Sequence, residues 1–157
     1  MSLLKHPAVV LLLSLVLGGT FLYSSWHKVA DPPDFAHVIN NYKLVPPSLI
    51  NPVAILMPWF EVFAGLAVLT GFLRRGGAMG LGLMTLAFIA ALGFNLYRGH
   101  PTICGCFGTF AEGKTLTEAE KFFKMKTEIL LDVGLFALCA VVFFGSGKRG
   151  EPEPRAA

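Results

Sequence analysis

Four long apolar stretches decide what this chain can fold into. They run from about Ala8 to Trp26, Ile50 to Leu73, Ala78 to Tyr97 and Ile129 to Gly145. Each is close to the ~20 mostly apolar residues with which an α-helix crosses a bilayer, where the backbone must satisfy its own hydrogen bonds. The composition agrees, because 54% of the residues are hydrophobic and only 15% are charged, unlike a soluble domain.

These stretches predict an all-α membrane protein, a four transmembrane helix bundle formed by residues 1–146 and surrounded by membrane lipid. Residues 147–157, with the sequence Glu-Pro-Glu-Pro near their middle, are predicted to form a disordered cytoplasmic tail. The net charge of +3 is small and spread over the loops, so nucleic acid is not expected as a partner.

The first apolar stretch has a second interpretation, a cleaved signal peptide with Lys5 as its charged region and Val9 to Leu17 as its apolar core. Apolar character continues past these residues to Trp26, and no A-x-A-like cleavage site follows. A retained anchor helix is therefore the favoured interpretation.

Basic residues in the short loops set the predicted orientation. With the N terminus in the cytoplasm, six lysines and arginines lie inside and seven outside, so the count alone is indecisive. Arg74-Arg75 and Lys148-Arg149 lie directly at predicted membrane ends, whereas four of the outer lysines lie in a long loop, where the rule is weaker. We therefore expect a bacterial inner-membrane protein with both termini in the cytoplasm.

Each of the two outer loops is predicted to contain a short helix. In residues 28–49, apolar side chains at helical spacing favour an amphipathic helix lying in the membrane interface, with Asp34 as N-cap and an end before Pro46. In residues 98–128, Thr117 and Glu120 match a capping box. The helix that follows carries Phe122, Phe123 and Met125 and is either separate from the fourth span or continuous with it.

The second outer loop also contains Cys104-Gly105-Cys106, the strongest indication of chemistry in the chain. Thiolates exchange electrons by direct contact, so a cysteine pair accessible to water and partner proteins suggests thiol redox chemistry. A disulfide across one glycine closes a very small ring, and strained, exposed disulfides are oxidising and labile. Arg98 and His100 lie just upstream and are placed to stabilise a thiolate, so Cys104 is predicted to attack the partner and Cys106 to resolve the mixed disulfide.

Other interpretations of the cysteines remain open. If the pair does not undergo redox cycling, it is either a static disulfide that holds the loop together or two unreactive thiols. A metal site formed by His100, Cys104 and Cys106 lacks a clear fourth ligand among nearby residues. Cys139 lies ten residues into the fourth apolar stretch, about 15 Å deep at 1.5 Å per residue, and is predicted to be a small apolar core residue.

Ionisable side chains inside a membrane are costly and are usually functional or paired. Glu61 lies near the middle of the second stretch and Asp132 in the first turns of the fourth. Further polar residues lie toward the same outer side, and we predict a polar pocket beneath the cysteine loop: Ser24, His27, Lys28, Asn95 and Arg98, with His100 nearby. The alternative is a structural ion pair, in which Lys28 or Arg98 neutralises Glu61 or Asp132.

Several motifs resemble one family when taken in order. They are Ser24-x-x-x-Lys28, Asn41-Tyr42-Lys43-Leu44-x-Pro46, Pro58-x-x-Glu61 and Cys104-Gly105-Cys106-Phe107-Gly108. The combination resembles the MauE branch of the MauE/DoxX membrane proteins. The resemblance implies a four-helix membrane protein associated with periplasmic thiol redox. In methylamine-utilising bacteria it implies a link to maturation of the disulfide-rich small subunit of methylamine dehydrogenase.

Three function classes follow. The leading hypothesis is a thiol–disulfide oxidoreductase component, in which Cys104 and Cys106 exchange with a periplasmic thioredoxin-like protein or a disulfide-containing client. No cofactor motif is evident, but a quinone is one candidate occupant of the polar pocket. The rivals are a non-enzymatic membrane assembly factor and, third, a small-molecule transporter in which Glu61 and Asp132 would be the coupling groups.

Overall fold

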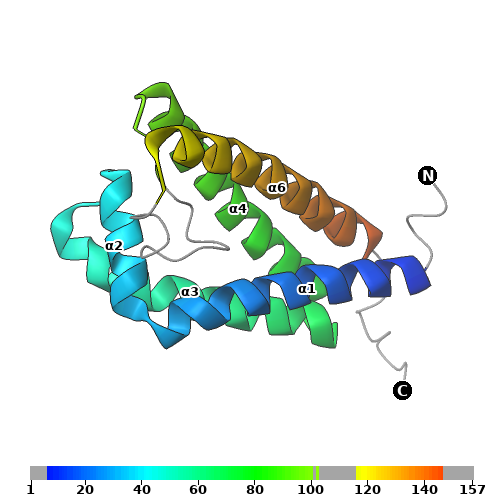
Figure 1. Cartoon of the computed structure of the whole chain (residues 1–157). Helices are drawn as coiled ribbons and strands as arrows, with labels where there is room; N and C mark the ends of the chain where they lie inside the picture. The colour runs from blue at the N-terminus through cyan, green and yellow to red at the C-terminus, as the bar shows by residue number, and fades with distance from the viewer. Residues whose placement is uncertain (1–6, 101, 103–115, 147–157) are drawn as a thin grey trace, which may run out of the picture.

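The protein is all-helical throughout the part that the computed structural model describes, residues 7–100, 102 and 116–146. The helices are α1 (Pro7–Ala30), α2 (Pro32–Tyr42), α3 (Pro47–Thr70), α4 (Arg74–Tyr97) and α6 (Glu118–Gly145) (Figure 1). Apart from α2, all of them are long and apolar enough to cross a membrane. The predicted four-helix membrane fold is confirmed, while the predicted tail at 147–157 lies outside the described residues.

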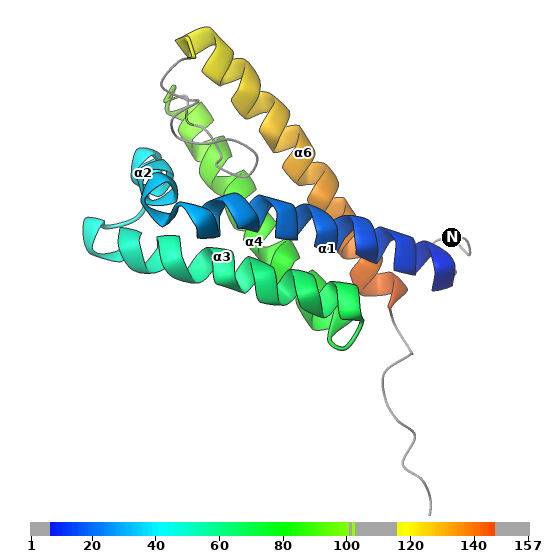
Figure 2. The same ribbon diagram turned by 60° about the horizontal axis from the view of Figure 1, so that its bottom comes forward.

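The four spans alternate in direction along the chain. One end of the bundle, the turn end, holds the start of α1, the α3–α4 turn and the end of α6 (Figure 1). The opposite end, the α2 end, holds α2 and the start of α6. Helix α1 packs along α3 and α4 along α6, while α1 and α6 diverge toward the α2 end (Figure 2).

Helices approach closely near the turn end because small residues lie at the crossings. A Cβ on Gly77 would lie 2.7 Å from the Ala64 carbonyl oxygen and 2.8 Å from Val68 Cγ2, so α4 contacts α3 almost backbone to backbone. Gly71 ends α3 with a φ of 79°, a conformation that favours glycine, and its amide donates to the Ala67 carbonyl.

Two apolar cores fill the bundle. The turn-end core joins all four spans and contains Leu17, Phe21, Ala64, Val68, Ala78, Leu81, Met84, Cys139 and Val142. The α2-end core contains Phe35, Val38, Ile39, Tyr42, Ile50, Ala54, Leu92 and Met125. Cys139 is 2% exposed in the turn-end core, so its predicted place among apolar residues is confirmed.

Helix α2 differs from the sequence prediction in two respects. Its N-cap is Asp31, whose carboxylate accepts a hydrogen bond from the Asp34 amide at 3.1 Å, so the prediction of Asp34 as N-cap was wrong. Pro32 and Pro33 then occupy the first helical positions, where an amide donor is not needed. The apolar face of α2 is buried against the bundle as part of the α2-end core, where we had expected it to lie in the membrane interface.

Helix α6 is one continuous helix of 28 residues, which settles whether the helix after Thr117 merges with the fourth span. The predicted capping box is present: the Thr117 hydroxyl accepts from the Glu120 amide, and the Glu120 carboxylate accepts from the Thr117 amide. The buried face of α6 follows helical spacing through Met125, Glu128, Asp132, Cys139 and Val142.

Candidate functional site

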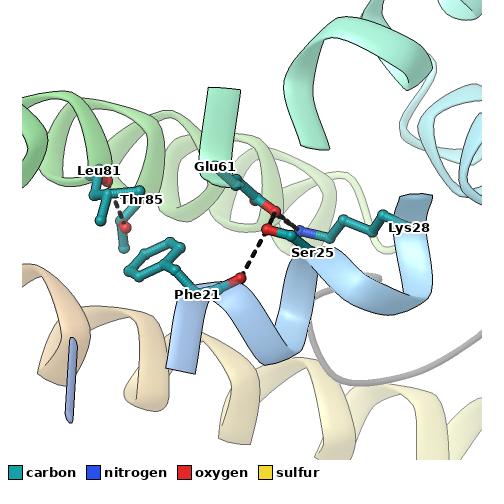
Figure 3. A network of polar contacts seen from close by, with 6 residues as sticks. All are labelled: Phe21, Ser25, Lys28, Glu61, Leu81 and Thr85. Carbon is teal, nitrogen blue, oxygen red and sulfur yellow. Dashed lines mark hydrogen bonds and ion pairs between the residues drawn. The ribbon is translucent and has the colours of Figure 1, made fainter. Parts of the chain in front are cut away.

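A layer of buried polar side chains lies between the two apolar cores, and we call it the polar layer. It receives residues from all four spans: Ser24, Ser25 and Lys28 from α1, Glu61 from α3, Thr85 from α4, and Glu128 and Asp132 from α6. Figure 3 shows that Ser25 and Lys28 of α1 and Glu61 of α3 point toward one another, with Thr85 nearby on α4. Polar groups buried in this way are costly unless they are paired, so their mutual geometry matters.

An ion pair between Lys28 and Glu61 forms the centre of the layer. Lys28 Nζ lies 2.7 Å from Glu61 Oε1 and 2.9 Å from Oε2, and the two side chains are only 3% and 1% exposed. Ser25 Oγ lies 2.9 Å from Glu61 Oε2 and 2.7 Å from the Phe21 carbonyl oxygen, so its one hydrogen is shared between these two acceptors (Figure 3). The Glu61 carboxylate is therefore held by a cation and a hydroxyl from one face of α1.

The direction of side chains on a helix explains how Lys28 reaches Glu61. Lys28 lies near the C-terminal end of α1, and helical side chains tilt back toward the N terminus, which brings its ammonium into the bundle. The ammonium lies 5.3 Å from the centre of the Phe35 ring and 5.4 Å from that of Phe88, within the range of cation–π attraction. Aromatic rings from α2 and α4 thus enclose the charge.

Two further acids enter the layer from α6. Glu128 and Asp132 are one helical turn apart, and both are buried. Tyr42 of α2, also buried, lies outside the membrane-spanning helices, and burial raises its pKa far above the usual range, with the Glu128 and Asp132 carboxylates adding to the effect. The Tyr42 phenol is therefore protonated at neutral pH and can donate a hydrogen bond.

A small pocket opens within the polar layer where the four spans meet. Its walls are Thr20, Phe21, Ser24, Glu61, Thr85, Phe88, Asp132 and Leu135. The free space inside admits about one water molecule.

The structure brings Ser24, Glu61 and Asp132 together in the wall of this pocket, and Lys28 joins them through its ion pair with Glu61. Asn95 is buried nearer the α2 end, where its amide donates to the Ala91 carbonyl.

Other predicted members of the pocket lie elsewhere. Arg98 and His100 are exposed and do not join the layer, and the Arg98 guanidinium lies 5.3 Å from the centre of the Phe94 ring on its own helix. His27 is also exposed, in an edge-to-face contact with Tyr23. The buried cation that neutralises Glu61 is therefore Lys28, the first of the two candidates.

The cysteine pair, Cys104 and Cys106, lies outside the described residues, and so does part of the suggested metal site with His100. Within the described residues, no group of three or more His, Cys, Asp or Glu side chains is placed to hold a metal ion.

Sequence reasoning missed three members of the layer: Ser25, Thr85 and Glu128. Glu128 had been assigned to the end of an outer loop. The signal for it was helical spacing, because Met125, Glu128 and Asp132 follow one face at intervals of three and four residues. Ser25 carries the same signal, three residues before Lys28.

Comparison with known families adds to this geometry. The family model described as "Methylamine utilisation protein MauE" matches residues 6–145, nearly the whole chain, and this range includes all five described helices. The chain belongs to the MauE family. Together with the four apolar helices, this membership indicates a multi-pass membrane protein.

Three curated relatives, each named "Methylamine utilization protein MauE", are similar to the chain. The protein of Methylophilus methylotrophus is 32% identical over 67% of this chain and 56% of its own length. That of Paracoccus denitrificans is 29% identical over 66% of this chain and 56% of its own length. That of Methylorubrum extorquens is 33% identical over 68% of this chain and 58% of its own length. The chain thus spans little more than half the length of these relatives, and no solved structure matches it.

Proposed function

We propose that this MauE-family protein supports thiol–disulfide exchange outside the cytoplasm, through Cys104 and Cys106, during maturation of a disulfide-containing client. The observation that carries the proposal is the Cys-Gly-Cys sequence in the segment between α4 and α6. A disulfide across one glycine is strained and passes readily to another thiol. Family membership supports a client in methylamine utilisation, such as the disulfide-rich small subunit of methylamine dehydrogenase.

In the proposed exchange, the Cys104 thiolate attacks a disulfide sulfur of the partner, which forms a mixed disulfide and releases one partner thiolate. The Cys106 thiolate then attacks the Cys104 sulfur, releases the second partner thiolate and closes a Cys104–Cys106 disulfide. Two electrons move to the partner, and the reverse sequence oxidises a client dithiol. A thioredoxin-like protein suits this exchange, and a quinone would serve only as a more distant electron acceptor.

Two described residues just before the cysteines, His100 and Thr102, contact the bundle. The His100 amide donates to the Asn95 carbonyl at 3.0 Å, directly after α4. Thr102, two residues before Cys104, is buried, and its hydroxyl lies 3.9 Å from the Met125 sulfur in the α2-end core. His100 and Thr102 therefore contact α4 and α6, respectively.

The proposed orientation places the α2 end outside and the turn end in the cytoplasm of a bacterial inner membrane. Arg74 and Arg75 lie at the turn end, at the same side as the start of α1, which supports this orientation by the positive-inside rule. A membrane-impermeant thiol reagent should then label Cys104 in cells whose inner membrane is intact. Labelling that requires permeabilised inner membranes would reverse the orientation.

The test of function uses variants in which one cysteine at a time is replaced, expressed in a methylamine-utilising host that lacks its own MauE. Cys104→Ser and Cys106→Ser should each abolish maturation of the client, whereas Cys139→Ser, in the turn-end core, is the matched control and should retain it. Cys106→Ser should accumulate a mixed disulfide that reductant releases, because the resolving thiol is missing. Full maturation in both loop variants would favour a non-enzymatic assembly factor instead.

A further inference from the structure

The turn between α3 and α4 exposes large apolar side chains at the turn end of the bundle. Phe72 is 87% exposed and Leu73 is 60% exposed, and Phe144, near the end of α6, is 74% exposed at the same end. Such side chains are costly in water, whereas at the end of a transmembrane helix they can lie among lipid acyl chains. The turn therefore fits the boundary between the acyl chains and the lipid headgroups.

Two arginines follow these apolar residues, and the first of them folds back onto α3. Arg74 Nε donates a hydrogen bond to the Val68 carbonyl oxygen at 3.4 Å. Its Nη2 lies 2.8 Å from the position that a Cβ on Gly71 would occupy, so the side chain crosses the turn closely. Arg74 thus serves the carbonyl end of α3, where basic side chains are favourable.

Arg75 is exposed and contacts a different helix. Its guanidinium carbon lies 5.0 Å from the centre of the Phe143 ring on α6, within the range of cation–π attraction. The Phe143 ring in turn makes an edge-to-face contact with Phe144, with 5.2 Å between the ring centres. Attraction to a ring positions the guanidinium but does not supply an oxygen acceptor for its five N–H donors.

The described residues offer no carboxylate to Arg75 at the turn end. Every Asp and Glu side chain among them lies in the polar layer or toward the α2 end. Their two ion pairs are Lys28–Glu61 and Lys121–Glu118, both away from this turn. At the level of the headgroups the abundant anion is the phosphodiester of a phospholipid, and a guanidinium matches its oxygens with two parallel hydrogen bonds.

We propose that Arg75 is the headgroup ligand in a binding site for an anionic phospholipid. The phosphodiester oxygens accept hydrogen bonds from the guanidinium, Phe143 positions the guanidinium, and Phe72 and Leu73 lie beside the acyl chains. A lipid with a net negative charge is preferred over a zwitterionic one, because no described carboxylate at this end attracts a choline or ethanolamine group. The site depends neither on the cysteine chemistry proposed above nor on which end of the bundle is cytoplasmic.

Native mass spectrometry of the full chain tests the site, after release from nanodiscs in which phosphatidylglycerol is the minor lipid and phosphatidylcholine the major one. The wild type should retain phosphatidylglycerol in preference to phosphatidylcholine. Arg75→Gln should lower this preference about fivefold, the effect of one basic residue near an anionic surface. Arg74→Gln is the matched control, because it removes the same charge from the same turn, and it should retain most of the preference.

The ring contact provides a second pair of variants. Phe143→Leu removes the ring that positions Arg75 and should lower the preference about twofold to fivefold, although no charge is lost. Phe144→Leu is its control and should leave the preference nearly unchanged, because the described contact of the guanidinium is with Phe143. Arg75→Lys keeps the charge without the planar guanidinium and should have an intermediate effect.

The absence of any preference in the wild type would overturn the proposal. Equal losses in Arg74→Gln and Arg75→Gln would also overturn it, since the general positive charge of the turn would then explain the binding. So would a preference seen only in Glu151→Gln/Glu153→Gln, because Arg75 would then pair with these acids of the chain. Circular dichroism identifies any variant that does not fold, and Arg75→Lys then gives the second measurement.

Discussion

In the turn-end core the spans are joined by close contact of small and apolar residues, whereas in the polar layer they are joined by charge. Gly77 allows α4 to approach the Ala64 carbonyl in the first region, and Lys28 reaches across to Glu61 in the second. The contact at Gly77 depends on the shape of the two helices, whereas the ion pair depends on the presence of both Lys28 and Glu61. The two regions should therefore respond to mutation in different ways.

The largest effect is expected at the buried ion pair. Lys28→Met should lower the free energy of unfolding in detergent micelles by ~3–5 kcal/mol, because it leaves the Glu61 carboxylate buried without its cation. The double variant Lys28→Met/Glu61→Met should recover most of that loss, since both charges are then gone. The control is Lys121→Met: its pair with Glu118 is exposed, so the loss should be at most ~1 kcal/mol. Equal losses in Lys28→Met and Lys121→Met would contradict the difference between the two pairs.

The next largest effect concerns the turn-end core. Gly77→Ala should cost ~1–3 kcal/mol, because the new Cβ meets a backbone oxygen at 2.7 Å that cannot move aside. Gly76→Ala is the matched control, with no atom within 4 Å of its Cβ, and should be neutral or stabilising by up to ~1 kcal/mol. Unfolding of both variants in the same micelles provides the measurement, and a comparable loss in the two would show that close approach is not what joins α3 to α4.

A smaller effect is expected at the start of α2, which covers the polar layer. Asp31→Ala should cost ~1 kcal/mol of local stability through loss of the cap, seen as faster amide hydrogen exchange throughout α2. Asp34→Ala tests the N-cap that the sequence had suggested and should have the smaller effect. Faster exchange in Asp34→Ala than in Asp31→Ala would restore the original assignment.

The smallest effect at neutral pH belongs to Tyr42. Its raised pKa means that the folded state retains the phenol proton at a pH where the unfolded chain, with an ordinary pKa of about 10, has released it. This contribution to stability is complete below pH ~10 and is lost as the pH rises further. Tyrosinate absorbance of Tyr42 should appear only with unfolding, and Tyr42→Phe should remove that step. Tyrosinate from Tyr42 in the folded protein would mean that the phenol is not buried against the two acids.

The sequence predicts the spans well because length and hydropathy alone determine whether a helix crosses a membrane. It predicts Ser24, Lys28, Glu61 and Asp132 as neighbours, since intramembrane polar residues seek one another. Sequence spacing does not reveal that α2 folds back over the bundle, which depends on the tertiary contacts of Phe35 and Tyr42. Arg98 illustrates the same limit, because the residue that follows a span can face water or the bundle and only packing decides.

The buried Lys28 has a consequence for biogenesis. The chain reaches the membrane from its N terminus onward, so Lys28 arrives well before Glu61, which is 33 residues later. Until then the ammonium must stay in water or among lipid headgroups, and the end of α1 cannot take its final depth. Emergence of α3 lets the pair form and draws this end of α1 inward. We expect α1 and α3 to become firmly embedded as a unit, with Glu61 as the residue that completes the insertion of the first span.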